Sequence, residues 1–154
     1  MTKSYFNLYL IENFLRIFIE ETAKSIYNED YWDELTIRKE VKRKINERRE
    51  EERKNKWLSL RGDSNIFYTD FEDLKKIISS NWELFKNNFP KEVWITSRLE
   101  DLYKLRNRIA HNSYLNENDQ KTIETYVNHI YSQLSTKQRY VNKLKFVIKK
   151  EKEE

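Results

Sequence analysis

Seven consecutive residues, from Arg106 to Asn112, bring together side chains that could handle a phosphate and a proton. They include two arginines and one of the two histidines in the 154-residue chain. A guanidinium can hold a phosphate with two parallel hydrogen bonds, and an imidazole can take or give a proton near neutral pH. Arg106, Arg108 and His111 could therefore cleave a phosphodiester bond without a metal ion.

Helical spacing decides which of these side chains can meet. His111 lies four residues after Asn107, so the two share one helix face. Arg106 lies five residues before His111, which turns the two side chains about 140° apart. A site that contains both must form where the helix ends, or across the two-fold axis of a dimer. Alternatively, Arg106 is an ion-pair partner of Glu12 or Asp101. His111 would then be a structural histidine favoured by the dipole at a helix C-terminus.

Composition predicts a single all-α domain. One Gly and one Pro argue against an all-β fold, which needs turn residues at short intervals, and a charged fraction of 36% is typical of solvated helices. The chain has no cysteine, which excludes disulfides and thiolate metal sites and is compatible with a cytoplasmic location. Two histidines alone do not make a metal site, so we expect neither a metal nor a cofactor. The apolar stretch 5–19 is interrupted by polar residues, so we expect no membrane span and no signal peptide.

Positive charge is concentrated in two stretches. Residues 38–56 contain ten Lys or Arg and five Glu, and residues 137–154 contain seven and three, so the rest of the chain is acidic. An acidic body with two basic arms is compatible with an anionic partner. The first arm could equally be solvated helix surface, or a helix that binds a second subunit or another protein. If the partner is a nucleic acid, the candidate phosphate contacts in this arm are Lys42, Arg43, Arg48 and Arg49.

Apolar periodicity predicts a bundle of about five helices. The second is expected to be long and charged, because no apolar residue occurs between Asn46 and Lys56. Thr69-Asp70-Phe71-Glu72 is typical of a capping box that opens the third helix, Pro90 ends it, and Asn116 caps the last. We expect one domain over residues 1–135 and a basic extension over 136–154. The expected helices span residues 4–27, 30–60, 70–89, 91–112 and 116–134.

Several residues that often occur in binding sites are expected to be structural here. His129 adjoins an apolar position of the last helix, which favours the edge of the core. The aromatic residues Trp82, Trp94 and Tyr103 fall at helix-face spacings, which favours core packing over base stacking.

The segment Arg106-Asn107-Arg108-Ile109-Ala110-His111 resembles the Arg-polar-(x)n-His motif of HEPN domains, a superfamily of small all-helical domains. The resemblance extends over roughly residues 4–134 and includes the leucine-rich helix before the motif. It also includes the capped, aromatic-rich stretch 70–88. In the first helix, Glu12 and Leu15-Arg16 are similar to the Glu-x-x-Leu-Arg pattern of that superfamily.

This resemblance implies a metal-independent endoribonuclease of the toxin or antiviral-defence type, in which two motif helices of a homodimer share one cleft. Arg106 would hold the scissile phosphate, His111 would take the proton of the ribose 2′-hydroxyl, and Asn107 would orient the pair. Glu12 would pair with Arg106 and set its orientation, or it would equally form a plain ion pair within its helix. The products would be a cyclic phosphate and a 5′-hydroxyl, which confines the activity to RNA. Alternatively, the chain is a non-catalytic RNA-binding or oligomerising module, or a toxin held by a cognate antitoxin or another partner protein.

Overall fold

The computed structural model of the chain describes residues 2–57, 59, 62, 64–111 and 114–135. Within these ranges the structure is built from helices, and no strand is present. This confirms the predicted all-α fold. Five of the described helices have ten residues or more, which agrees with the expected bundle of about five. The expected extension over 136–154 lies outside the described residues, and the division of the chain at residue 135 stays a prediction.

The helices follow one another along the chain with short connections. Three single turns of 3-10 helix occupy Asn28–Asp30, Asn65–Tyr68 and Lys86–Asn88. The α-helices are α1 (Lys3–Tyr27), α2 (Tyr31–Glu34), α3 (Lys39–Lys54), α4 (Phe71–Ser80), α5 (Trp82–Phe85), α6 (Glu92–Ala110) and α7 (Glu117–Leu134).

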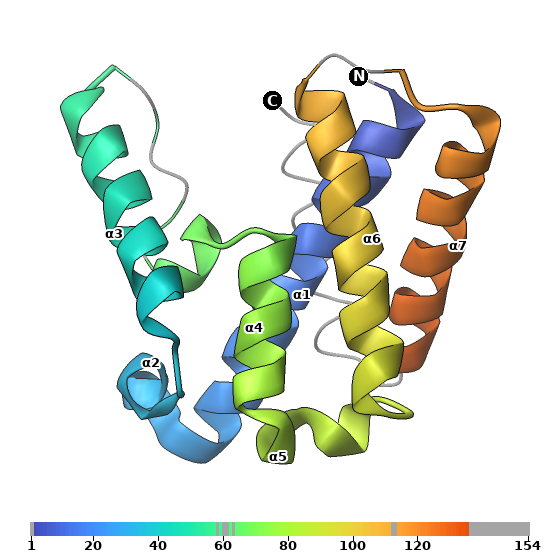
Figure 1. Cartoon of the computed structure of the whole chain (residues 1–154). Coiled ribbons are helices and arrows are strands. Elements are labelled where there is room, and N and C mark those ends of the chain that lie inside the picture. Colours follow the sequence, from blue (N-terminus) through green and yellow to red (C-terminus); the bar gives the residue numbers. More distant parts are fainter. Residues whose placement is uncertain (1, 58, 60–61, 63, 112–113, 136–154) are drawn as a thin grey trace.

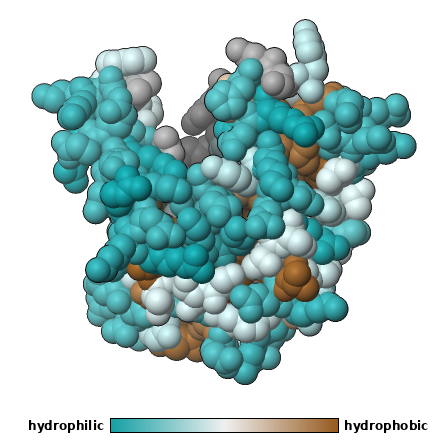
Figure 2. Space-filling view, viewed as in Figure 1, coloured by the Kyte–Doolittle hydropathy of each residue, from teal (hydrophilic) through white to brown (hydrophobic). Residues whose placement is uncertain are grey.

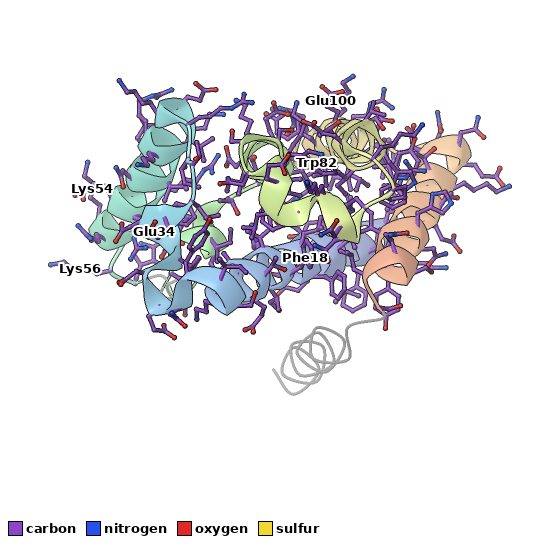
Figure 3. The ribbon with its side chains drawn as sticks, turned by 90° about the horizontal axis from the view of Figure 1, so that it is seen from below. Phe18, Glu34, Lys54, Lys56, Trp82 and Glu100 are labelled. Carbon is purple, nitrogen blue, oxygen red and sulfur yellow. The ribbon has the colours of Figure 1, made fainter. Side chains whose placement is uncertain are left out.

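The core lies between α1, α4, α6 and α7 (Figure 1). Helix α1 crosses behind the others and packs against α7, α6 and α4, while α4 packs along α6. Phe18 of α1, labelled in Figure 3, is fully buried against the rings of Phe85 and Phe89. Burial of large apolar side chains of this kind contributes about 1.5–3 kcal/mol each, so this cluster holds the bundle together.

The long charged helix is present as α3, but the expected bounds of 30–60 were wrong. The chain becomes extended at Leu35, where φ is −68° and ψ is 142°. Leu35 and Ile37 are both buried, which alternating residues of an extended segment can achieve. The side chain of Asn81 accepts a hydrogen bond of 2.8 Å from the Thr36 amide and donates one of 2.9 Å to the Thr36 carbonyl. These contacts satisfy the amide and the carbonyl of Thr36 where the helix is interrupted.

Two capping boxes fix the starts of α4 and α7. Asp70 caps α4, where the sequence predicted Thr69. The Asp70 side chain accepts from the amide of Asp73, whose own side chain accepts from the amide of Asp70. The predicted box was therefore shifted by one residue. Asn116 caps α7 and is paired in the same way with Asp119. Since both starts are fixed locally, the sequence was sufficient to locate them to within one residue.

Helix α3 forms an arm at one side of the bundle (Figure 1). Its inner face buries Val41 and Ile45. Seen from below, Lys54 and Lys56 point away from the bundle at the outer side of this arm (Figure 3). None of the described helices combines the length and the apolar character that crossing a membrane requires.

Candidate functional site

An open cavity of about 240 Å³, here called the motif cavity, lies between α1, α3, the start of α4 and α6. The surface is hollowed between α3 and the C-terminal half of α6 (Figure 2). Helix α6 presents residues to the cavity at spacings of three, four and seven, which is one face of a helix. The lining residues are Glu12, Arg16, Arg48, Thr69, Asp70, Phe71, Tyr103, Arg106, Asn107 and Ala110.

Arg106 is held in this cavity by an aromatic ring. Its guanidinium carbon lies 5.0 Å from the centre of the Tyr5 ring, a cation–π contact that fixes the side chain without neutralising it. Among the described residues, no carboxylate forms an ion pair with Arg106. The two alternatives raised from the sequence are therefore not observed, because Glu12 pairs with Arg16 and Asp101 accepts from the Tyr126 hydroxyl.

The structure brings Asn107 to Arg106 but leaves His111 apart from them. Asn107 lines the motif cavity. His111 is the residue that ends α6, is exposed, and is not among the residues that line the cavity. Its amide donates to the Asn107 carbonyl at 3.0 Å. Within one chain, Arg106 and His111 therefore do not face the same cavity.

Glu12 supports Arg16 rather than Arg106. Its carboxylate lies 3.0 Å from the Arg16 guanidinium, and Arg16 also donates to the side chain of Asn13 and the carbonyl of Thr69. Arg16 is buried and lines the motif cavity, so it adds a fixed positive charge beside Arg106. The Leu15-Arg16 pattern in the sequence pointed to this residue but not to its place at the cavity.

The comparison with family models matches residues 7–135, from the first turns of α1 to the end of α7, to Swt1-like HEPN. This match covers most of the chain and every residue that lines the motif cavity. The chain belongs to the Swt1-like HEPN family. The predicted resemblance to HEPN domains is thereby confirmed, and the domain is of the HEPN ribonuclease-like type. Neither curated proteins nor solved structures gave a match to the chain.

Arg48 of this HEPN domain binds carboxylates inside the molecule. It donates to Asp73 and to the Tyr68 carbonyl at 2.6 Å each, and lies 3.2 Å from Asp70. The Asp73 side chain is 0% exposed, and burial raises its pKa, while hydrogen bonds from Arg48 and the Asp70 amide oppose the rise. Burial lowers the pKa of Arg48, but Asp73 and Asp70 together raise it above its ordinary value. Arg48 thus joins α3 to the start of α4 at the wall of the cavity.

The other candidate phosphate contacts divide into two groups. Arg49 faces inward, donating to the Asn65 side chain at 2.6 Å and lying over the Tyr68 ring. Lys42 and Arg43 are exposed on α3, where Arg43 pairs with Glu47 at 2.9 Å. Of the four candidate residues on α3, only Lys42 and Arg43 have side chains that contact no other element of the described chain.

Arg108 faces away from the motif cavity. Its guanidinium lies 2.8 Å from Asp119, the residue that completes the capping box of α7. It therefore ties the end of α6 to the start of α7. This leaves Arg106 as the arginine of the motif that faces the cavity.

Tyr103 packs against the core, as the sequence predicted, and it also lines the motif cavity. It lies three residues before Arg106 and four before Asn107, so it extends the cavity face of α6 by one turn. Its hydroxyl forms no hydrogen bond with any described residue. The spacing of three and four residues from Arg106 and Asn107 would have identified Tyr103 as a cavity residue if the sequence had shown which face of the helix lines the cavity.

Within the described ranges, no group of three or more His, Asp or Glu is placed to hold a metal ion. The charged groups that line the motif cavity are three arginines and the two acidic residues Glu12 and Asp70. Both carboxylates are bonded to arginines, so Arg106 is the cation there that remains available to an anionic ligand.

Proposed function

We propose that this HEPN domain is a metal-independent endoribonuclease of the toxin or antiviral-defence type, and that two copies complete each active site. The observation that carries the proposal is the state of Arg106. It faces an open cavity, it is fixed over Tyr5, and no described carboxylate neutralises it. A preorganised guanidinium without a counter-ion favours a phosphate, which it can bind through two parallel hydrogen bonds.

The proposed reaction is a transesterification within RNA. The ribose 2′-oxygen attacks phosphorus and gives its proton to His111, while the bond from phosphorus to the 5′-oxygen of the next nucleotide breaks. A cyclic phosphate results, and the departing 5′-oxygen takes a proton from water to become a 5′-hydroxyl. Arg106 stabilises the charge that develops on the phosphate, since its pKa is too high for proton transfer. Asn107 orients the phosphate beside it.

The need for two copies follows from where His111 lies. It ends α6 outside the motif cavity of its own chain. Beside it, a depression of about 490 Å³ is lined by Ile109, Tyr114 and Leu115 together with the start of α1, and Tyr114 is fully exposed. In the proposed dimer, a second copy binds against this end of α6 and contributes its His111 to the site of the first.

Loss of cleavage on removing either motif side chain tests the proposal. The purified chain is incubated with end-labelled RNA in EDTA, beside Arg106→Ala, His111→Ala and the control Lys104→Ala. Lys104 is exposed on the same helix and does not line the cavity. We expect each motif variant to lower the rate by a factor of about 100 or more, as loss of a proton-transfer group or charge stabiliser does. Lys104→Ala should cleave like the unchanged chain.

Two results would reject the ribonuclease. One is the absence of cleavage by the unchanged chain, and the other is cleavage that survives both motif substitutions. RNA with a 2′-deoxyribose at the cleavage position should resist cleavage, because the attacking hydroxyl is missing. A toxin role further predicts that expression arrests growth of the host, and that the same two substitutions relieve the arrest.

One observation favours a second candidate function, a non-catalytic RNA-binding or scaffolding module. Lys42 and Arg43 are exposed on α3, and Lys54 and Lys56 point away from the bundle (Figure 3). Phosphate contacts from such an arm would give affinity without cleavage. RNA binding that weakens with salt, persists in His111→Ala and yields no products would support this candidate over the ribonuclease. A cognate antitoxin or other partner protein would be a further occupant of the arm.

A further inference from the structure

Arg98 lies between two aromatic rings at the opposite end of α6 from the motif. Its guanidinium carbon is 4.2 Å from the centre of the Trp94 ring and 5.3 Å from the centre of the Tyr126 ring on α7. It also donates to the Trp94 carbonyl at 2.8 Å. Two rings and one hydrogen bond fix the position of this side chain without neutralising its charge.

Among the described residues, His129 is the one side chain besides the two rings with which the Arg98 guanidinium forms a polar or π contact. Its Nδ1 lies 3.2 Å from Nη2 and 3.4 Å from Nε of Arg98. Because Arg98 is always protonated, Nδ1 must be the acceptor, which puts the ring proton on Nε2, away from the guanidinium. The sequence placed His129 at the edge of the core, but the residue is exposed.

The positive charge of Arg98 is not compensated by a described acidic group. No described carboxylate forms an ion pair with Arg98, and Asp101 instead accepts from the Tyr126 hydroxyl at 3.1 Å. Burial and this carboxylate raise the pKa of Tyr126, so its phenol stays neutral beside Arg98. The neighbourhood therefore carries a fixed cation and no neutralising group in contact with it.

These side chains open onto a depression of about 340 Å³ between the first half of α6 and the second half of α7. None of its lining residues is acidic, and several carry polar hydrogens. They are Trp94, Arg98, Asn128, His129, Ser132 and Gln133. A rigid guanidinium with polar neighbours and no carboxylate is suited to an oxyanion.

We propose that this depression, here called the Arg98 pocket, binds a phosphate of the RNA outside the motif cavity. The choice of RNA rests on the proposed function, whereas the preference for phosphate rests on the pocket itself. Arg98 precedes Arg106 by eight residues, which separates them by about 12 Å along α6 and about 80° around it. An RNA must therefore cross α6 to reach both, so a long strand uses the Arg98 pocket and a very short one does not.

Binding of 2′-O-methyl RNA, which cannot be cleaved by 2′-hydroxyl attack, tests this pocket separately from catalysis. Affinities of a 20-mer and a tetramer are measured by fluorescence anisotropy at several salt concentrations. The variants are Arg98→Gln, Arg98→Lys and Lys121→Gln, which removes one exposed charge from α7 and is the control for net charge. Urea unfolding of each variant shows whether it is folded.

For the 20-mer, we expect Arg98→Gln to weaken binding at least fivefold and to reduce the slope of log K against log salt by about one, as loss of one phosphate contact does. Arg98→Lys should restore only part of the affinity, because a lysine lacks the planar fork. The tetramer should bind all variants alike. Lys121→Gln should change the 20-mer affinity less than twofold.

Three results would overturn the proposal: an Arg98→Gln affinity equal to that of Lys121→Gln, an equal loss for tetramer and 20-mer, or a pocket that takes only free phosphate. The last is recognised when inorganic phosphate shifts the His129 ring resonances and the 20-mer affinity is unaffected by Arg98→Gln. Since no step of this test needs cleavage, an inactive chain that still loses 20-mer affinity would reject the ribonuclease and retain the pocket.

Discussion

Arg106 and Tyr103 face the same cavity from successive turns of α6, and their partners differ. Arg106 is held over Tyr5, while the Tyr103 hydroxyl is bonded to no described residue. A hydroxyl that lines a cavity without an internal partner is available to a ligand, and a typical net hydrogen bond contributes about 1 kcal/mol. Tyr103 is therefore a candidate contact to the RNA beside the phosphate held by Arg106.

Replacing Tyr103 with Phe removes this hydroxyl and keeps the ring. We expect kcat/KM for RNA cleavage to fall about fivefold, the loss of one hydrogen bond of about 1 kcal/mol, with little change in the urea midpoint. The matched control is Tyr131→Phe. The Tyr131 ring of α7 packs on Phe14 of α1, and neither residue lines the cavity. An equal kcat/KM for Tyr103→Phe and the unchanged chain would remove Tyr103 from the site.

The sequence predicted the motif residues better than their partners. The type and spacing of Arg106 and Asn107 were enough to select them, and both line the cavity. The partner of Arg48 was not accessible in this way, because Asp73 lies 25 residues further along the chain. Glu12 was predicted either to pair with Arg106 or to form a plain helix ion pair, and the structure shows the second, an i, i+4 pair with Arg16.

At the scale of elements, one buried ion pair joins the α3 arm to the body. Asp73 is fully buried, and Arg48 supplies its closest opposite charge at 2.6 Å, with Lys44 at 4.0 Å. Breaking a buried pair by removing one partner typically costs about 3–5 kcal/mol, since a charge is left without compensation. The position of α3, and with it one wall of the motif cavity, depends on this contact.

The pH dependence of Arg48→Gln stability follows from Asp73. Burial raises the pKa of Asp73 in the folded chain above its ordinary value. A carboxyl of this kind favours the fold most below its unfolded pKa, and that contribution is lost as pH rises through the folded pKa. Without Arg48 the pKa of Asp73 should rise further. We therefore expect Arg48→Gln to lower the free energy of unfolding by about 3 kcal/mol at pH 7 and by clearly less at pH 4.

Urea unfolding at the two pH values measures this difference. Arg43→Gln is the control, because it breaks the exposed pair with Glu47 and should cost about 0–1 kcal/mol at either pH. In an Asp73→Asn background, the pH-dependent part of the Arg48→Gln loss should disappear. A loss of equal size at pH 4 and pH 7 would show that Arg48 does not compensate the Asp73 charge.

Element boundaries were predictable where their cause was local. Asp70 and Asn116 cap their helices through residues three positions away, and the sequence located both starts to within one residue. The break before α3 has a distant cause, because the amide of Asn81 that bonds Thr36 lies 45 residues further along. Helical spacing alone could not predict that contact.

At the scale of the whole molecule, composition was enough for the fold class but not for the assembly. One Gly, one Pro and a high charged fraction indicated a helical bundle, and the structure and the family match agree. The proposed pairing of two copies could not be located from composition, because the periodicity of one chain does not specify which surface forms a dimer. The proposed second copy rests on the separation of Arg106 and His111 within one chain.

Mixing two inactive variants tests most directly whether Arg106 of one copy acts with His111 of the other. Arg106→Ala and His111→Ala chains are co-refolded in equal amounts, and RNA cleavage is measured in EDTA. Half of the dimers should be mixed, and each should contain one intact site of two, so we predict about a quarter of the unchanged activity. A mixture as inactive as its two components, with mixed dimers shown to form, would contradict a site shared between subunits.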